Sequence, residues 1–254
     1  MTAKPKKRRA DQALVDRGLV ETRSKAQALV MAGKVFSGEQ RIAKPGQPIS
    51  EETPLDVRGQ DHPWVSRGGL KLEKGLDAFT IDPTGFTCID VGASTGGFTD
   101  VLLQKGAAKV YAVDVGRGQL HWKLRTDDRV VVLEQTNARN LTETDIPEPA
   151  DIVVCDASFI GLEKVLPAAL ALTRETAFLV ALIKPQFQVG RGEVGKGGVV
   201  RDPDLHDKVC NEVRDWVEGL AGWRALGIVE SPITGPEGNR EFLIGAKKSS
   251  SEPA

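Results

Sequence analysis

The chain has 254 residues, of which 40% are hydrophobic and 27% are charged, and its formal net charge is −1. These values are typical of a folded α/β protein with room for a small second domain, and they exclude a disordered or fibrous chain. The longest apolar run, which ends at Ile183, is far shorter than the roughly 20 residues of a membrane helix. Cys88, Cys155 and Cys210 are odd in number and widely spaced. They predict reduced core thiols of a cytoplasmic protein rather than a disulfide or a metal site. The short apolar run predicts that the protein has no membrane partner.

The charge is unevenly distributed along the chain. Residues 1–44 carry eleven lysines and arginines against four acidic residues, so the remainder of the chain is acidic. A basic amino-terminal region on an acidic body indicates a polyanionic partner that the basic region binds.

The amino-terminal region predicts two short helices and a small β element. The first helix runs from Asp11 to Arg17, and a second begins at Thr22 or Ser24 and ends at Gly33. A turn then separates two short strands, and three prolines follow. A unit of this size buries little apolar surface, so we expect it to depend on its neighbour or on a ligand.

Composition divides the chain into four parts. Residues 1–60 form the small amino-terminal domain, and 61–69 form a linker that is rich in glycine and contains a proline. Residues 70–248 form the larger domain, and 249–254 form a disordered tail. Within the linker, we expect Trp64 to be exposed.

The larger domain is organised around a strand, a glycine turn, a helix and a second strand. The first strand ends at Val91, and the second ends beside Asp114, which lies 18 residues after Gly96. Gly92, Gly96 and Gly97 allow a ligand to approach the backbone closely. A carboxylate at the position of Asp114 can accept both hydroxyls of a ribose, so the stretch predicts a nucleoside-cofactor site.

The remaining elements continue the alternation of helices and strands. Apolar spacing predicts helices over 72–79, over 162–169 and from Pro203 onward, and strands over 130–133, 152–155, 177–183, 224–229 and 241–246. The link 231–240 is too short for a crossover helix, so the last strand should be antiparallel to its neighbour. Five charged side chains should therefore meet at one edge of the sheet, namely Asp90, Asp114, Asp156, Lys184 and Glu241.

The glycine turn does not have the G-x-G-x-x-G spacing of dinucleotide-binding proteins. Asp90 followed by Gly92–Gly97 instead resembles the first motif of S-adenosylmethionine-dependent methyltransferases. The resemblance implies a Rossmann-like class I methyltransferase sheet, in which the acid and the turn hold the methionine end and Asp114 holds the ribose. It implies cofactor contacts from Asp90, Gly92, Ser94, Thr95, Gly96, Gly97, Phe98, Asp114, Val115 and Asn137. The alternative is a plain strand–helix–strand unit with a tight turn.

The amino-terminal pattern ADQALVDRGLV, followed by RSKAQALVMAGKV, resembles a compact α+β RNA-binding domain. That domain is named after a small-subunit ribosomal protein and is shared by pseudouridine synthases and tyrosyl-tRNA synthetases. The resemblance implies RNA contacts from Arg9, Arg23, Lys25 and Lys34. We also expect Arg67 of the linker to contact RNA. The alternative is an ordinary solvated helix surface.

Four strings of the larger domain resemble the Lys-Asp-Lys-Glu tetrad of FtsJ-type ribose 2′-O-methyltransferases. They are RGGLK ending at Lys71, DASF starting at Asp156, KPQF starting at Lys184 and GNRE ending at Glu241. Together with the RNA-binding pattern, they resemble the TlyA family, called hemolysin A in some descriptions. The resemblance covers about residues 9–247 and implies methylation of a cytidine ribose in ribosomal RNA or ribosomal subunits, with Lys184 as general base.

Other acceptors and functions fit the sequence less well. Asp156 is not followed by the Pro-Pro-aromatic run of amine methyltransferases, and Cys155 should point away from the edge where a base-carbon nucleophile is needed. The four residues could alternatively form a surface ion-pair network. Two further alternatives are a membrane-lytic protein, which would act only indirectly, and a non-catalytic RNA-binding assembly factor.

Overall fold

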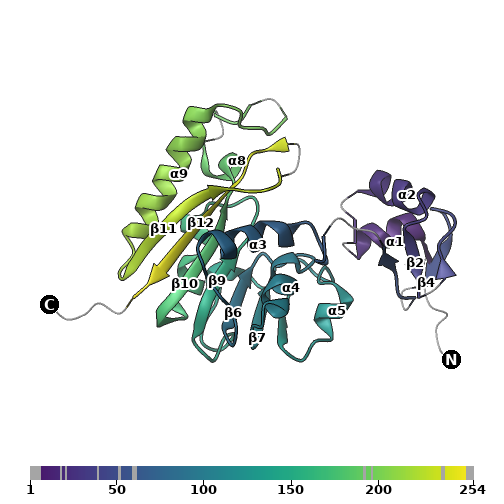
Figure 1. Cartoon of the computed structure of the whole chain (residues 1–254), viewed down its shortest axis with the longest axis horizontal. Helices are drawn as coiled ribbons and strands as arrows, with labels where there is room; N and C mark the ends of the chain where they lie inside the picture. Colours follow the sequence, from purple (N-terminus) through teal and green to yellow (C-terminus); the bar gives the residue numbers. More distant parts are fainter. Residues whose placement is uncertain are drawn as a thin grey trace.

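The computed structural model describes residues 7–17, 19–20, 22–38, 40–50, 53–58, 62–190, 193–195, 197–235 and 238–249. They form a small amino-terminal unit and a larger unit built on one sheet (Figure 1). Several residues of the sequence predictions lie outside the described ranges, namely Gly18, Asp61 and the predicted tail after Ser249. No helix in these ranges is both long enough and apolar enough to cross a membrane.

The small unit combines two helices with two short sheets. Its elements are β1 (Lys7–Arg9), α1 (Ala10–Asp16), α2 (Arg23–Met31), β2 (Val35–Ser37), β3 (Gln40–Arg41), β4 (Pro48–Ser50) and β5 (Asp56–Val57). β1 pairs with β4, and β2 lies between β3 and β5, all antiparallel. Thr22 caps α2 by accepting a hydrogen bond from the Lys25 amide at 3.2 Å. Leu14, Val30 and Ile42 belong to a core of its own, and the predicted two helices and β element are confirmed.

The larger unit is a seven-stranded sheet with helices on both faces. Its strands are β6 (Thr87–Val91), β7 (Lys109–Val113), β8 (Val130–Leu133), β9 (Ala150–Cys155), β10 (Thr173–Ile183), β11 (Trp223–Glu230) and β12 (Phe242–Lys248). They lie in the order β11-β12-β10-β9-β6-β7-β8. β12 runs antiparallel to both neighbours, whereas β10, β9, β6, β7 and β8 are mutually parallel. The predicted Rossmann-like sheet with an antiparallel last strand is confirmed.

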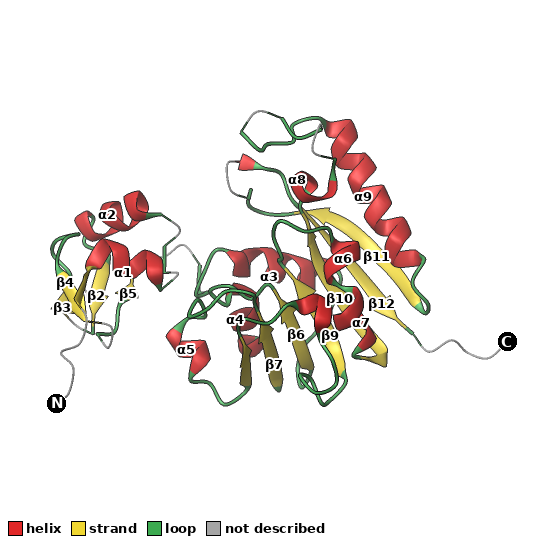
Figure 2. Ribbon diagram, turned by 180° about the vertical axis from the view of Figure 1, so that it is seen from behind, coloured by secondary structure: helices red, strands yellow, loops and turns green. Residues whose placement is uncertain are grey.

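Helices cover both faces of this sheet (Figure 2), and the sheet separates two hydrophobic clusters, one on each face. The helices are α3 (Gly68–Ala78), α4 (Gly97–Gln104), α5 (Trp122–Arg125), the 3₁₀ turn η1 (Ala138–Asn140), α6 (Leu162–Val165), α7 (Pro167–Ala171), α8 (Pro185–Gln188) and α9 (Pro203–Glu218). Residues of α3 and α4 pack on one face, and residues of α6, α7 and α9 pack on the other. α3 comes so close to the sheet that a Cβ at Gly75 would lie 2.8 Å from a methyl group of Val180. This close approach fixes the height of α3 above the sheet.

Several predicted elements differ from the observed ones by a few residues, and two of the differences have a clear physical cause. The single helix predicted over 162–169 is two short helices, because Pro167 cannot continue the first helix and instead begins the second. β10 begins at Thr173 rather than Ala177, and its pairing with β9 shifts register between Thr173 and Phe178. Such a local irregularity leaves little trace in the apolar pattern.

The expected exposure of Trp64 is wrong. Its side chain is only 6% exposed and lies against Gly69, where an added Cβ would come within 2.4 Å of the indole. The indole nitrogen donates to Glu73 at 3.3 Å, and the Val65 amide donates to Asp100 at 2.9 Å. Gly68 and Gly69, the last two residues of the predicted linker 61–69, already belong to α3. Residues 64–69 therefore contact the sheet domain, because burying a tryptophan stabilises the fold more than exposing it.

Candidate active site

Three adjacent strands and one helix bring the predicted Lys-Asp-Lys-Glu residues together. Asp156 follows β9 and Lys184 follows β10, both at the carboxyl end of a parallel strand. Glu241 precedes β12, whose reversed direction places its first residue at the same edge. Lys71 reaches this edge from the first turns of α3. The sheet topology thus accounts for a cluster drawn from positions up to 170 residues apart.

The four side chains form a continuous chain of contacts. Lys71 Nζ donates to Glu241 Oε2 at 2.7 Å and lies 3.9 Å from Asp156 Oδ2. The second oxygen of Asp156, Oδ1, lies 2.6 Å from Lys184 Nζ. Lys71 and Lys184 are each 7% exposed, and Glu241 is 1% exposed. Asp156, the more open carboxylate, is therefore shared by the two lysines.

The environment of Lys184 includes a residue that sequence reasoning missed. Besides its ion pair with the Asp156 carboxylate, the amine donates hydrogen bonds to the Asp156 main-chain oxygen at 3.0 Å and to Ser158 Oγ at 2.8 Å. Ser158 belongs to the Asp-Ala-Ser-Phe string and is exposed. Its position in that string was the available signal, but its contact with Lys184 depends on the fold.

A second missed residue, Asn239, fastens the segment before Glu241. Its side chain is 3% exposed, accepts a hydrogen bond from the Val200 amide and donates to the Gly198 carbonyl, each at 3.1 Å. His206 of α9 contacts the Val200 carbonyl at 3.0 Å. These contacts tie the end of the glycine-rich segment after α8 to the strand that delivers Glu241.

The cofactor residues predicted from the glycine turn lie on the neighbouring half of the same edge. Asp90 in β6 is fully buried, and its Oδ2 accepts a hydrogen bond from Thr99 at 2.6 Å. Its other oxygen, Oδ1, has no hydrogen-bond partner within the described part of the chain. Burial raises the pKa of the Asp90 carboxyl to about 7. A positively charged ligand group could donate the hydrogen bond that this buried oxygen lacks.

The turn itself requires glycine and is followed by a second carboxylate, that of Asp114. Gly92 has φ +83°, and a Cβ there would lie 2.9 Å from the Ala157 backbone, so a larger residue does not fit. Asp114 accepts hydrogen bonds from the Ser94 amide at 2.9 Å and the Gly116 amide at 2.7 Å. These bonds fix its orientation and leave further lone pairs on both oxygens. Val115 beside it is 71% exposed.

The other predicted cofactor residues differ in what they can offer a ligand. The Phe98 side chain is 3% exposed and packs in the core, so only its main chain can face a cofactor. Gly96 and Gly97 form the start of α4, and the Thr95 carbonyl accepts a hydrogen bond from the His121 amide at 3.1 Å. Asn137 follows β8 at the same edge and caps the 3₁₀ turn η1.

An aromatic pair beside the tetrad was also missed by sequence reasoning. Phe159 is 89% exposed, has φ +66° and follows Ser158 directly. Its ring lies 4.9 Å from the ring of Phe187 on α8, with an interplanar angle of 45°. An exposed aromatic residue held at a left-handed backbone position is unusual, and such positions are concentrated at functional sites.

The predicted RNA-binding arginines of the small unit share one carboxylate. Arg9 and Arg23 both donate to Asp11, with distances of 2.9–3.0 Å, and Gln27 donates to it at 2.8 Å. The Arg9 guanidinium, helped by Gln27 and Arg23, holds the pKa of the Asp11 carboxyl well below its usual range. Each arginine side chain is half exposed, whereas that of Asp11 is buried. Asp11, which sequence reasoning did not single out, thus orients two guanidinium groups at the surface.

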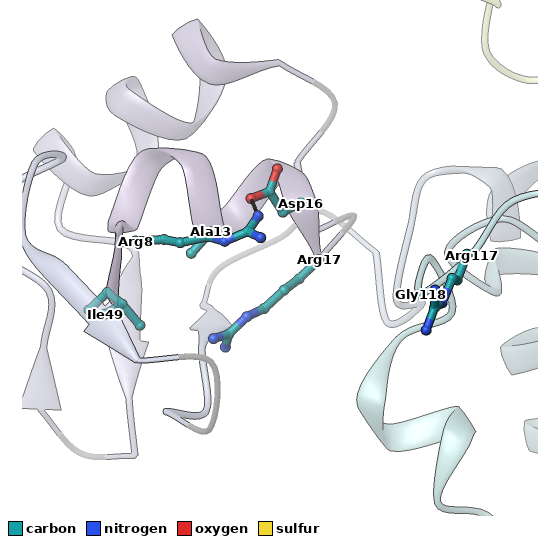
Figure 3. Close-up of a pocket in the computed structure, with 7 residues that line it drawn as sticks. All are labelled: Arg8, Ala13, Asp16, Arg17, Ile49, Arg117 and Gly118. Carbon is teal, nitrogen blue, oxygen red and sulfur yellow. Dashed lines mark hydrogen bonds and ion pairs between the residues drawn. The ribbon is translucent and has the colours of Figure 1, made fainter. Parts of the chain in front are cut away.

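The other predicted RNA-binding residues are dispersed. Lys25 lies on α2, and Lys34 precedes β2 in the same unit. Arg67 is exposed at the start of α3, four residues before Lys71. An open cavity of about 620 Å³ separates the small unit from the loop after β7 (Figure 3). Its lining residues are Arg8, Ala13, Asp16, Arg17, Ile49, Arg117 and Gly118.

The described residues contain no group of three or more histidine, cysteine or acidic residues that could hold a metal ion. Cys88 and Cys155 are free and buried, and Cys155 packs in the hydrophobic core rather than at the edge of the sheet.

Comparisons with known proteins agree with this architecture. The sequence pattern of the FtsJ-like methyltransferase family matches residues 64–248, and that of the S4 domain matches residues 8–54. The chain is 49% identical to a 16S/23S rRNA (cytidine-2′-O)-methyltransferase, TlyA, of Mycobacterium tuberculosis, over 93% of this chain and 88% of the relative. It is 41% identical to a protein named Hemolysin A of Brachyspira hyodysenteriae, over 92% of this chain and 98% of the relative.

A solved structure from Streptococcus thermophilus, described provisionally as a hemolysin, has a TM-score of 0.76. It is 45% identical, and the match covers 98% of this chain and 90% of that chain. A methyltransferase structure from Listeria monocytogenes has a TM-score of 0.53 at 15% identity, which shows a shared fold only. The match over residues 64–248 extends across most of the sequence. This protein therefore belongs to the FtsJ-like methyltransferase family and carries an S4 domain at its amino-terminal end.

Proposed function

We propose that this protein uses S-adenosylmethionine to methylate the ribose 2′-hydroxyl of a cytidine in ribosomal RNA. The observation that carries the proposal is the contact chain Glu241–Lys71–Asp156–Lys184 at the carboxyl edge of the sheet. The neighbouring strands β6 and β7 deliver Asp90 and Asp114 to the same edge. The proposed proton acceptor and the proposed nucleoside-binding residues therefore belong to neighbouring strands at one edge of the sheet.

The residues of the cofactor half fit S-adenosylmethionine. The unpartnered oxygen of Asp90 suits the positively charged methionine end, and the fixed carboxylate of Asp114 suits the two ribose hydroxyls. Exposed Val115 supplies an apolar surface for the adenine. When bound, the cofactor supplies a methyl group already activated by a sulfonium.

The four clustered residues would then align the acceptor and remove its proton. Lys184 accepts the 2′-hydroxyl proton, because its amine is the basic group held at the edge of the sheet beside the cofactor half. Asp156 holds this amine in place, and Lys71, fixed by Glu241, orients Asp156 from its other side. Fixed alignment of an activated methyl group with its acceptor accounts for much of the rate enhancement expected of such a site.

Features of the surface support RNA as the acceptor. The exposed ring of Phe159 lies beside the tetrad, where it can stack on a base that has left its helix. Arg67 lies at the same opening, and Asp11 orients Arg9 and Arg23 on the S4 domain for phosphates. The relatives named as rRNA cytidine methyltransferases favour a cytidine in ribosomal RNA.

The buried carboxyl of Asp90 predicts a pH-dependent affinity for the cofactor. If the ionised form binds the methionine end, affinity should rise with pH up to about 7, where Asp90 ionises, and level off above it. The rise should approach tenfold per pH unit well below that pKa. Titration calorimetry between pH 5.5 and pH 8 measures this slope. The Asp90→Asn variant, which cannot ionise, should bind more weakly and lose the Asp90-dependent part of the slope.

Methyl mapping on ribosomal RNA tests the proposed function. Purified protein, methyl-labelled cofactor and unmodified ribosomal subunits should yield label on a cytidine 2′-oxygen, located by nuclease digestion and mass spectrometry. Label on a base would contradict the ribose assignment. Tight RNA binding without any label, under conditions that support cofactor binding, would favour the RNA-binding assembly factor.

A further inference from the structure

The strongest unassigned feature of the tetrad region is the hydroxyl of Ser158, which contacts the amine of Lys184. Three oxygen atoms surround Lys184 Nζ: Asp156 Oδ1 at 2.6 Å, Ser158 Oγ at 2.8 Å and the Asp156 main-chain oxygen at 3.0 Å. As an ammonium, the lysine donates hydrogen bonds to the Ser158 hydroxyl and to the Asp156 main-chain oxygen, and it forms an ion pair with Asp156 Oδ1. In that state, no lone pair is available to accept a proton.

Loss of one proton changes what the three oxygens can do. A neutral amine has two hydrogens and one lone pair, and both Asp156 oxygens can only accept hydrogen bonds. Of the three contacting atoms, the Ser158 hydroxyl alone carries a hydrogen, so it alone can reverse and donate. When Ser158 donates, the lone pair of the amine therefore points at Ser158, while the amine can still donate to the Asp156 main-chain oxygen.

The position of Ser158 suits a group that touches the acceptor. Lys184 is 7% exposed, whereas Ser158 is exposed and directly precedes the exposed Phe159. An acceptor ribose whose base lies on Phe159 reaches the hydroxyl of Ser158 more readily than the buried amine behind it. We infer that Ser158 relays the proton of the ribose 2′-hydroxyl to Lys184 and is a catalytic residue of this site, an inference that rests on the proposed function.

The relay balances as one coupled transfer. The 2′-O–H bond breaks and its proton forms a new O–H bond on Ser158, while the original Ser158 O–H bond breaks and its proton forms an N–H bond on Lys184. The electron pair left on the 2′-oxygen forms the bond to the methyl carbon, and the sulfonium sulfur keeps the pair of the broken S–C bond. Ser158 ends as it began, and Lys184 ends as an ammonium that returns its proton to water.

A proton inventory tests the relay in the unaltered enzyme. Single-turnover methyl transfer is measured in mixtures of light and heavy water, with saturating cofactor and ribosomal substrate. If two protons move together, a plot of the rate against the deuterium fraction of the solvent should be curved. A straight line, which indicates one proton in flight, would overturn the relay, while label on the 2′-oxygen in the same reaction would leave the proposed function intact.

Substitutions at Ser158 give an independent measure. Ser158→Ala should slow the single-turnover rate by roughly 10- to 100-fold, less than a complete loss of acid–base catalysis. Cofactor and RNA affinity should be unchanged, and Ser158→Thr, which keeps a hydroxyl, should restore most of the rate. Ser249→Ala, at an exposed serine at the far end of β12, is the matched control and should behave as wild type. Wild-type rates in Ser158→Ala, or a Ser158→Thr variant as slow as Ser158→Ala, would refute the inference. Label on a base in the wild-type reaction would instead refute the proposed function.

Discussion

Replacing Lys184 by alanine should lower the rate of methyl transfer by roughly 10² to 10⁴, the range that general acid–base catalysis supplies. The amine of Lys184 is the proposed proton acceptor, and its contacts are to Asp156 and Ser158 rather than to either predicted ligand anchor, Asp90 or Asp114. Affinity for cofactor and for RNA should therefore change little. Single-turnover methyl transfer measures the rate, and calorimetry with filter binding measures the two affinities.

Lys164→Ala is the matched control, because this lysine on α6 is largely exposed and forms an ion pair at 3.9 Å with the neighbouring Glu163. Its rate should equal that of wild type. A Lys184→Ala enzyme that transfers methyl groups within a few-fold of wild type would remove Lys184 from the role of base. A loss of cofactor affinity equal to the loss of rate would assign it to binding instead.

Replacing Glu241 by alanine should destabilise the fold as well as slow the reaction. Glu241 is 1% exposed and makes the 2.7 Å contact with Lys71, so its loss leaves a buried ammonium whose remaining ion-pair partner among the described residues is Asp156, at 3.9 Å. Breaking a buried ion pair costs about 3–5 kcal/mol in the free energy of unfolding. Denaturant titration of the two proteins measures this difference.

A double-mutant cycle separates the buried charge from general packing. In the Glu241→Ala background, the further change Lys71→Met should cost little or recover stability, since it removes the uncompensated charge. Additive losses from the two substitutions would show that the pair is not coupled. Glu212→Ala, at an exposed glutamate of α9, controls for the loss of an acidic side chain and should leave stability unchanged.

The fold and three of the four clustered residues were predictable from local signals, whereas Lys71 was assigned to the cluster by the family resemblance. Each strand of the larger unit contains a short apolar run, and Asp156, Lys184 and Glu241 adjoin strand ends. The short connection before the last strand predicts its reversed direction, and with it the arrival of Glu241 at the shared edge. Local patterns and one topological rule thus suffice to assemble these residues.

The residues that sequence reasoning missed depend on contacts between distant segments. Ser158 meets Lys184 across 26 positions of the sequence, and Asn239 meets Val200 and Gly198 across 39 and 41 positions. Trp64 was expected to be exposed because proline and glycine surround it, yet it is buried beside Glu73. Composition describes the neighbours of a residue in sequence and does not describe what packs against it after folding.

A 2′-deoxy nucleotide at the target position tests the central claim most directly. Ribosomal RNA is assembled with either cytidine or 2′-deoxycytidine at the mapped position, and single-turnover methyl transfer is measured on both with the wild-type protein. Because the 2′-hydroxyl is the proposed acceptor, the deoxy substrate should bind with similar affinity and receive no methyl group. Methylation of the deoxy substrate at the normal rate would place the acceptor on the base and contradict the role proposed for Lys71, Asp156, Lys184 and Glu241.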